Sequence, residues 1–219
     1  PQIPTRMIQW SHVSGCSYPA LPFEFAEVFH KVFFTTEYTK DNPYWTSEQR
    51  RIISSKSEVI YGAGNINDIA VLYHKSHKGF HVGYVGTLNY SKLNPEFAYI
   101  ASLIDIPDVK FIMVGDLQKK LQIINDAKKF NICNKLEFTG YIKDVSTALA
   151  SFDVFGYPLN PWHFGSTENA LIEAMAAEIP VVAFNQAAEK YIIKHMETGL
   201  LADTYEHYAQ LIKYLFENP

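Results

Sequence analysis

Short apolar runs alternate with amphipathic segments along most of this 219-residue chain. The apolar runs are rich in β-branched and aromatic residues, and they predict strands at RMIQWSHV, KVFFTTEY, EVIYG, FHVGYVGT, VKFIMVGD, KLEFTGYI, FDVFGYPL and PVVAF. The segments between them predict helices at PFEFAEVFH, WTSEQRRII, NPEFAYIASLI, LQKKLQIINDAKKF, DVSTALASF, TENALIEAMAAE, AAEKYIIKHM and YEHYAQLIKYLFE. Alternating strands and helices form right-handed βαβ units, so we predict an α/β fold with a Rossmann-like, doubly wound parallel sheet.

One polar, His- and Lys-rich stretch interrupts the alternation. It is NINDIAVLYHKSHKGF, and we interpret residues 65–80 as a linker between two domains. Residues 81–219 supply enough βα steps for a nearly complete Rossmann-like domain, whereas residues 1–64 supply about three steps, which is few for such a sheet. We therefore expect one Rossmann-like domain and part of a second.

The composition excludes several classes of protein. A net charge of -4 and a pI near 6.1 give no general attraction for nucleic acid, whose backbone requires clustered Lys and Arg. Cys16 and Cys133 lie far apart and outside any C-x-x-C pattern, so neither a disulfide framework nor a zinc ribbon is indicated. No apolar run has the length of a membrane span and the N-terminal residues lack a signal-peptide layout. We therefore expect a cytoplasmic location.

A strand-loop-helix turn within HFGSTENALIEAMAAEIPVVAF, residues 163–184, is the main candidate site. Ser166 or Thr167 is predicted to cap the helix, whose free N–H groups and positive dipole end would form an anion pocket over Gly165 to Asn169. Doubly wound proteins contain several such turns, so the turn alone does not define a phosphate site.

Glu173 is the one charge within the apolar stretch ALIEAMAA of this helix. A buried carboxylate requires a partner, and the ribose hydroxyls of a nucleotide whose phosphate lies at the helix start would supply one. The alternative is that Glu173 lies on a narrow solvent-facing strip of the helix.

A second phosphate-binding candidate is FHVGYVGTLNYSK, a strand ending in a glycine turn with Lys92 close behind. Other patterns are weaker. The dinucleotide fingerprint beginning at Gly62 and Gly64 lacks its third glycine, because that position is Asn67. A metal at His74, His77 and His81 is disfavoured, since no Cys or carboxylate joins them and two lysines lie between them.

Taken together, GYVGTLNYSK, VKFIMVGD, KLEFTGYI, FDVFGYPLNPWHFGSTENALIEAMAAEIPVVAF and AAEKYIIKHMETGLLA resemble the donor-binding C-terminal domain of retaining glycosyltransferases of family 4, which have the GT-B architecture. The resemblance spans about residues 80–203, and ENALIEAMAAEIPVV is its most specific segment. It implies two Rossmann-like domains facing across a cleft. It also implies that the chain is a fragment, lacking most of the first domain and the final helices, and that the fragment alone is inactive.

The resemblance also assigns roles to the main candidate site. Glu173 matches the second glutamate of the family's E-x7-E pattern, which binds the donor's ribose. The first glutamate falls at position 165, where this chain has Gly165. Either His163, Ser166 or Glu168 takes its place near the donor sugar, or the sugar is recognised in a different way.

The remaining assignments concern the diphosphate, the base and the facing domain. The family's diphosphate-binding Arg and Lys fall at Thr87 and Lys92. The strong charge-assisted contact of the arginine with the diphosphate is therefore lost, and the helix N-terminus would contribute more to diphosphate binding. Tyr141 and Ile142 would contact the base, and His12 would line the cleft from the first domain. The catalytic candidates are therefore His12, His163 and Glu168.

The function implied is transfer of a sugar from a nucleoside-diphosphate sugar to an acceptor hydroxyl with retention, in the biosynthesis of surface polysaccharide or glycolipid. No cofactor or metal is expected, because protein donors and helix dipoles would stabilise the leaving diphosphate. The acceptor would be a sugar or a lipid-linked molecule, and the latter fits peripheral association with the inner face of the membrane. The alternatives are a non-catalytic nucleotide-sugar-binding module and a GT-B nucleotide-sugar epimerase.

Overall fold

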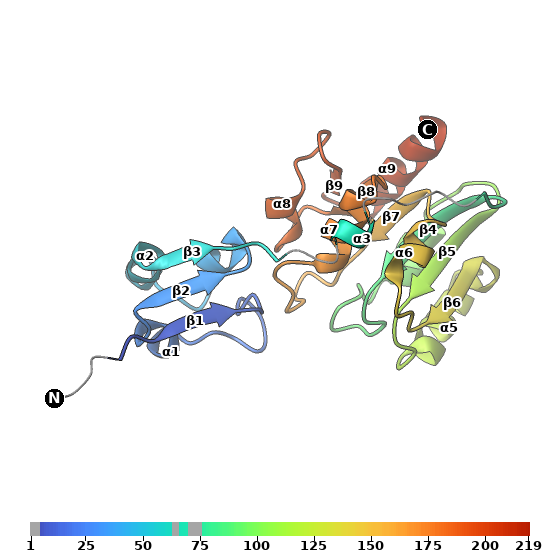
Figure 1. Cartoon of the computed structure of the whole chain (residues 1–219). Helices are drawn as coiled ribbons and strands as arrows, with labels where there is room; N and C mark the ends of the chain where they lie inside the picture. The colour runs from blue at the N-terminus through green and yellow to red at the C-terminus, as the bar shows by residue number, and fades with distance from the viewer. Residues whose placement is uncertain (1–4, 63–65, 70–75) are drawn as a thin grey trace.

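The computed structural model describes residues 5–62, 66–69 and 76–219, and its strands form two parallel sheets (Figure 1). The smaller sheet has the order β1-β2-β3. Its strands are β1 (Ile8–Ser11), β2 (Lys31–Phe34) and β3 (Ser57–Val59). The connections contain α1 (Phe23–Glu27), the 3-10 helix η1 (Glu37–Asp41) and α2 (Ser47–Ser55).

The larger sheet has six strands in the order β6-β5-β4-β7-β8-β9. The strands are β4 (Phe80–Val85), β5 (Val109–Val114), β6 (Leu136–Gly140), β7 (Val154–Tyr157), β8 (Val181–Phe184) and β9 (Leu200–Ala202). The intervening helices are α4 (Phe97–Ser102), α5 (Lys120–Lys129), η2 (Cys133–Lys135), α6 (Val145–Leu149), α7 (Asn169–Ala176) and α8 (Glu189–Ile192), and α9 (Tyr205–Glu217) follows β9.

The strand order of the larger sheet defines its topology. Counted from β4, the chain first builds outward through β5 to β6, then returns to the other side of β4 and builds outward through β7 and β8 to β9. This is the Rossmann order, and it confirms the predicted α/β fold with a doubly wound parallel sheet. The order reverses between β4 and β7, so a crevice is expected beyond the carboxyl ends of these two strands.

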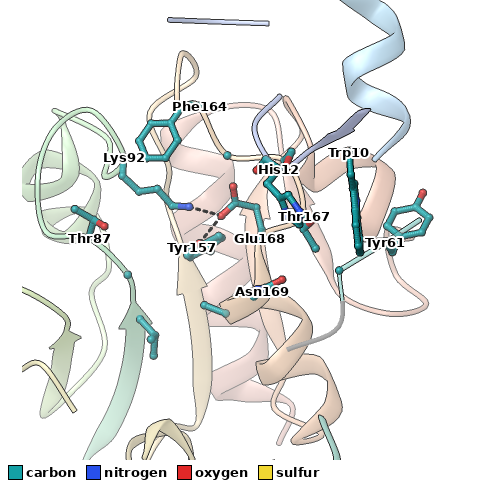
Figure 2. A pocket seen from close by; sticks show the side chains of 16 residues that line it. Trp10, His12, Tyr61, Thr87, Lys92, Tyr157, Phe164, Thr167, Glu168 and Asn169 are labelled. Atoms are coloured by element: carbon teal, nitrogen blue, oxygen red, sulfur yellow. Dashed lines mark hydrogen bonds and ion pairs between the residues drawn. The ribbon is translucent and has the colours of Figure 1, made fainter. Parts of the chain in front are cut away.

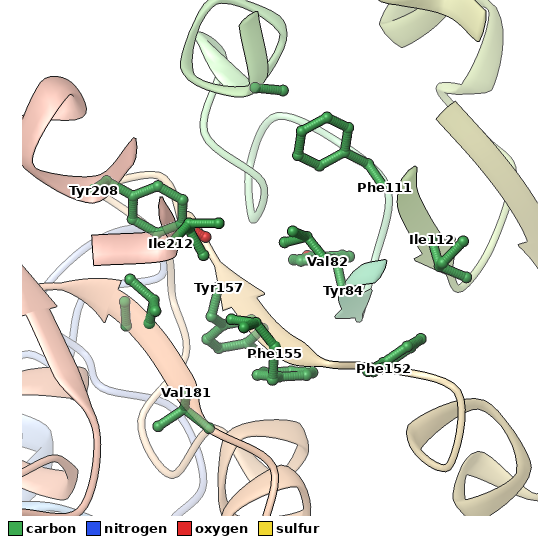
Figure 3. Packing of buried hydrophobic residues seen from close by; sticks show 14 of the residues in the cluster. Val82, Tyr84, Phe111, Ile112, Phe152, Phe155, Tyr157, Val181, Tyr208 and Ile212 are labelled. Carbon is green, nitrogen blue, oxygen red and sulfur yellow. The ribbon is translucent and has the colours of Figure 1, made fainter. Parts of the chain in front are cut away.

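Aliphatic and aromatic side chains together fill the core of the larger sheet (Figure 3). Strands β7 and β8 are buried at every position, as expected for central strands covered by helices on both faces. Tyr84 and Tyr157, on the adjacent strands β4 and β7, pack with ring centroids 5.6 Å apart. Gly83 of β4 makes room for Phe152, whose ring would lie 2.1 Å from a Cβ at that position.

Four short elements were not predicted from the sequence: strand β9, helix α3 and the 3-10 helices η1 and η2. Strand β9 was missed, because its three residues are too few to show a period. Residues 65–80, predicted as a linker, contain the helix α3 (Ile66–Ile69), and Ile69 packs into the core of the larger sheet. Gly64 and His74, which entered the weak motifs above, lie outside the described residues.

No helix among the described residues has the length and apolar character needed to cross a membrane.

Candidate functional site

A cavity of about 580 Å³ lies at the carboxyl ends of β4 and β7, where the strand order reverses (Figure 2). Both sheets contribute to its walls. The larger unit contributes Val85, Gly86, Thr87, Lys92, Tyr157 and residues 164–170, and the smaller unit with the segment after it contributes Trp10, His12, Tyr61 and Gly62. Ligands of doubly wound proteins bind at this position in the fold, so this cavity is the candidate site.

Glu168 lies at the centre of the cavity wall. Its carboxylate is buried, and Oε2 accepts hydrogen bonds from Lys92 Nζ and Tyr157 Oη, each at 2.6 Å (Figure 2). Its other oxygen, Oε1, has no hydrogen-bond partner among the described residues. The residue has a φ of 52°, in the left-handed region that non-glycine residues rarely adopt. Such strain is maintained only where surrounding contacts hold the residue.

Opposing effects act on the ionisation of Glu168. Burial raises the pKa of its carboxyl, but the nearby Lys92 ammonium, His163 and the hydrogen bond from Tyr157 lower it, and the net shift is downward. The carboxylate is therefore ionised at neutral pH. Burial and the negative charge of Glu168 raise the pKa of Tyr157 well above its usual value, so its hydroxyl remains a hydrogen-bond donor.

Residue 165 is a glycine because the Glu168 side chain leaves no room there for a Cβ. A Cβ at residue 165 would lie 1.6 Å from Glu168 Oε1 and 3.0 Å from His163 Nδ1. The Glu168 carboxylate thus fills the space in which a side chain at position 165 would begin. Any larger residue at 165 would displace that carboxylate.

His163 lies behind Glu168 and is fully buried, outside the residues that line the cavity. Its Nδ1 accepts a hydrogen bond from the Gly165 N–H at 3.1 Å, which places the proton of a neutral imidazole on Nε2. Nε2 then donates to Glu189 Oε2 at 3.2 Å. From this position His163 supports the loop and Glu168. That His163 acts directly on a substrate remains a prediction.

Hydrogen bonds connect the loop before α7 to the smaller unit. They run from Ser14 N–H to the Phe164 carbonyl (3.1 Å), from Ser17 Oγ to the His163 carbonyl (3.0 Å), from Ser166 Oγ to the His12 carbonyl (3.1 Å), and between Thr35 Oγ1 and Ser166 Oγ (2.5 Å). Because the Ser166 hydroxyl donates its only proton to the His12 carbonyl, Thr35 is the donor in the last bond. Both units therefore hold the loop that carries Glu168.

The prediction that Ser166 or Thr167 caps α7 is wrong. The N-cap residue is Glu168, in a left-handed conformation and without a side-chain capping bond. Ser166 instead uses its hydroxyl to contact the smaller unit. The pattern was misleading because a serine before a helix is a capping signal only when the next residues enter the helix directly.

Most of the predicted binding residues lie along the cavity. Thr87, Gly165, Ser166, Thr167 and Asn169 line it, as do Lys92 and His12. Three of the predicted binding residues lie outside this lining. Glu173 is half-buried on α7, one turn beyond Asn169. Tyr141 is exposed just after β6, and Ile142 packs against the core of the larger sheet. Their proposed contacts with ribose and base remain predictions.

Sequence reasoning missed four aromatic residues that line the cavity, namely Trp10, Tyr61, Tyr157 and Phe164. Tyr157 could have been found, because it ends a predicted central strand and the carboxyl ends of such strands form ligand sites. Trp10 and Tyr61 belong to the other wall, and no local pattern shows that they face the larger sheet.

Within the described residues, no group of three or more His, Cys, Asp or Glu side chains is arranged to hold a metal ion. Lys92 is the one Lys or Arg among the described residues that line the cavity. Two aromatic rings surround its ammonium, at 5.8 Å from the Tyr157 centroid and 5.9 Å from that of Phe164. The cavity wall thus combines one ammonium, a buried carboxylate and two aromatic rings.

The chain belongs to the glycosyl transferases group 1 family, whose family model matches residues 70–219. It is 33% identical over 100 residues to a 2-deoxystreptamine N-acetyl-D-glucosaminyltransferase of Niallia circulans, covering 45% of this chain and 25% of that protein. It is also 33% identical over 114 residues to a GDP-Man:Man(3)GlcNAc(2)-PP-Dol alpha-1,2-mannosyltransferase of Dictyostelium discoideum, covering 48% of this chain and 22% of that protein.

Solved structures share the fold at low sequence identity. Anabaena Alr3699/HepE in complex with UDP and glucose has a TM-score of 0.78 and 18% identity, over 97% of this chain and 62% of that one. Sucrose-phosphate synthase from Thermosynechococcus elongatus has a TM-score of 0.76 and 18% identity, over 100% of this chain and 60% of that one. The architecture is therefore GT-B, and the chain spans about a quarter of these curated relatives and six-tenths of these solved structures.

Proposed function

We propose that this chain is the donor-binding part of a family 4 glycosyltransferase that transfers a sugar from a nucleoside diphosphate to an acceptor hydroxyl with retention at the anomeric carbon. One observation carries the proposal. The cavity lies at the switch point of a Rossmann sheet and combines the N-terminus of α7, the turn after β4, and a buried carboxylate. The first two suit a diphosphate, and the third suits a sugar.

The diphosphate would lie between the turn after β4 and the start of α7. The backbone N–H of Thr87, together with the dipole of α7, would stabilise the charge of the leaving diphosphate. Thr87 supplies only a hydroxyl where the family has an arginine. Glu173, one turn along α7, would accept hydrogen bonds from the ribose, and Tyr141 and Ile142 would contact the base.

Catalysis would depend on positioning and on stabilisation of the leaving group, without a strong side-chain nucleophile and without a metal. The acceptor would approach from the wall formed by the smaller unit, where His12 and the exposed rings of Trp10 and Tyr61 lie. A sugar or lipid-linked acceptor in surface polysaccharide or glycolipid biosynthesis fits this arrangement. We place the protein in the cytoplasm, at the inner face of the membrane when the acceptor carries a lipid.

A non-catalytic nucleotide-sugar-binding module is the second candidate. It is favoured by Thr87 and Gly165, which replace an arginine and a glutamate of the family pattern. The presence of Glu168 in the space next to Gly165 supports the transferase instead, because a carboxylate is kept in the cavity.

Calorimetric titration with UDP, GDP and ADP tests the proposal. We expect one of them to bind, and Glu173→Ala to weaken that binding about tenfold, since the variant removes a charged acceptor of ribose hydrogen bonds. Glu178→Ala is the control, because Glu178 is exposed just beyond the other end of α7. Failure of all three nucleotides to bind, or equal losses in both variants, would contradict the proposal.

A further inference from the structure

Four ionisable side chains lie together along the wall of the cavity and behind it, and we call them the buried cluster. They are Lys92, Glu168, His163 and Glu189, and the last three have no side-chain surface exposed to solvent. Lys92 Nζ lies 2.6 Å from Glu168 Oε2, Glu168 Oε1 lies 3.4 Å from His163 Nδ1, and His163 Nε2 lies 3.2 Å from Glu189 Oε2. With a neutral His163, two carboxylates face one ammonium, so one negative formal charge remains uncompensated.

The buried cluster is also short of hydrogen-bond donors. Glu168 Oε1 and Glu189 Oε1 are buried and have no hydrogen-bond partner among the described residues. Neither oxygen is accessible, so a ligand in the cavity does not supply the missing donor. His163 Nδ1 faces Glu168 Oε1 but is itself an acceptor, of the Gly165 N–H at 3.1 Å. Two acceptors thus face each other without a proton between them, which is costly in a buried site.

One proton on His163 Nδ1 would correct both deficits. It would give Glu168 Oε1 a charge-assisted hydrogen bond and would cancel the uncompensated negative charge of the buried cluster. The Gly165 N–H would lose its acceptor in exchange, but that bond is neutral and weaker than the one gained. Burial opposes a charge on the imidazole, whereas a nearby anion favours it. Because Gly165 and Glu168 line the cavity, a diphosphate bound there lies close enough to shift this balance.

The other titratable groups around the buried cluster are tyrosines, a cysteine and one histidine. Burial and the nearby carboxylate raise the pKa of Tyr157 well above its ordinary value. On the side of the smaller unit, burial raises the pKa of Tyr38 and of Cys16 to about 12 each. These three groups are therefore neutral near pH 7 and take up no proton when a ligand binds. His12, in the cavity wall, is the second histidine that has to be separated from His163 by experiment.

We propose that His163 takes up a proton from the solvent when a nucleoside diphosphate binds in the cavity, and that it acts as a positioning residue for the loop before α7. The inference rests on the proposed function. The protonated imidazole bridges Glu168 and Glu189, so the diphosphate faces a neutral cluster instead of a negative one. When the diphosphate leaves, the proton returns to the solvent.

Calorimetry in buffers of different ionisation enthalpy measures this proton. UDP, GDP and ADP are titrated at about pH 7.5, and the slope of the observed enthalpy against the ionisation enthalpy of the buffer gives the number of protons taken up. We expect about one half to one proton per nucleotide bound, and a Kd that falls by up to about tenfold for each unit by which the pH is lowered. The terminal phosphate of the nucleotide, with a second pKa of about 6, loses protons beside a cation and so contributes with the opposite sign.

Two histidine variants assign the proton. We expect His163→Gln to bind the nucleotide without proton uptake and with a Kd that no longer depends on pH, whereas His12→Gln should keep the uptake. A merely structural role of His163 would weaken binding in His163→Gln but would give no uptake in the wild type. If His163→Gln unfolds, Glu189→Gln replaces it, because this variant removes one negative charge from the buried cluster and should reduce the uptake at least about twofold.

The outcomes separate this inference from the proposed function. Binding of a nucleotide by the wild type without proton uptake overturns the role of His163 and leaves the proposed function standing. Uptake that is lost in His12→Gln and kept in His163→Gln or Glu189→Gln has the same meaning. Absence of binding by UDP, GDP and ADP overturns both.

Discussion

At the scale of single residues, the Gly165–Glu168 pair is the most distinctive feature of the site. Gly165→Ala should push the Glu168 carboxylate away from Lys92, because a Cβ there would lie 1.6 Å from Oε1. We expect the free energy of unfolding to fall by about 1–3 kcal/mol, as for other overpacked sites. Chemical denaturation measures this change. In the background of Glu168→Ala the same substitution should cost clearly less, and equal costs in both backgrounds would refute the contact.

The ion pair of Glu168 also makes a prediction about pH. The folded state lowers the pKa of this carboxyl below its ordinary value of 4.5, so its ionisation stabilises the fold at neutral pH. That contribution is lost as the pH falls from about 4.5 through the lower pKa of the folded state. Melting temperatures measured between pH 7 and pH 3 should therefore fall less steeply for Glu168→Gln than for Glu178→Gln. Parallel slopes would contradict the lowered pKa.

At the scale of elements, the ends of β4, β5 and β6 approach each other closely behind the cavity. Gly115, just after β5, has a φ of 153°, and a Cβ there would lie 1.9 Å from the Gly86 carbonyl oxygen. Gly115→Ala should therefore destabilise the fold by about 3 kcal/mol and weaken nucleotide binding by shifting the turn at Thr87.

The control for this prediction is Gly140→Ala, at the last residue of β6. Gly140 also has a positive φ, 79°, but the nearest atom to a Cβ there is 3.9 Å away. The control thus carries backbone strain without the clash. Unfolding curves and UDP titrations of both variants decide the matter, and equal losses of nucleotide binding would show that the contact with Gly86 is unimportant.

The elements themselves were largely predictable from the sequence. The central strands are buried on both faces, so their apolar runs are continuous, as in VVAF of β8. The last strand, β9, was not predicted because it is three residues long. Helix α3 was not predicted because its four residues lie within a polar stretch. Short elements are set by tertiary packing, which the local pattern does not contain.

At the scale of the whole molecule, the loop before α7 depends on both units. Thr35→Val keeps the shape of the side chain and removes the hydrogen bond to Ser166. We expect a loss of about 1 kcal/mol in stability and weaker binding of UDP, because the loop carrying Glu168 would lose one of its anchors. Thr39→Val is the control, since Thr39 is also buried in the smaller unit and its hydroxyl makes no hydrogen bond among the described residues. Equal binding of UDP by both variants would argue against this coupling.

The candidate site was predictable only in part, and the reason lies at this scale. Lys92, Thr87 and the residues before α7 were found because strand ends and a family resemblance mark them. The ion pair between Lys92 and Glu168 joins residues 76 positions apart. The second wall comes from the smaller sheet. Such contacts depend on how the chain packs, and the sequence pattern of either segment alone does not reveal them.

Hydrogen exchange of the chain with and without saturating UDP tests whether the diphosphate binds in the cavity. We expect UDP to slow exchange in two segments, residues 86–92 after β4 and residues 165–170 at the start of α7, because these form the diphosphate side of the cavity. Unchanged exchange in both segments, or slowing confined to the opposite ends of the strands, would show that the diphosphate does not bind there.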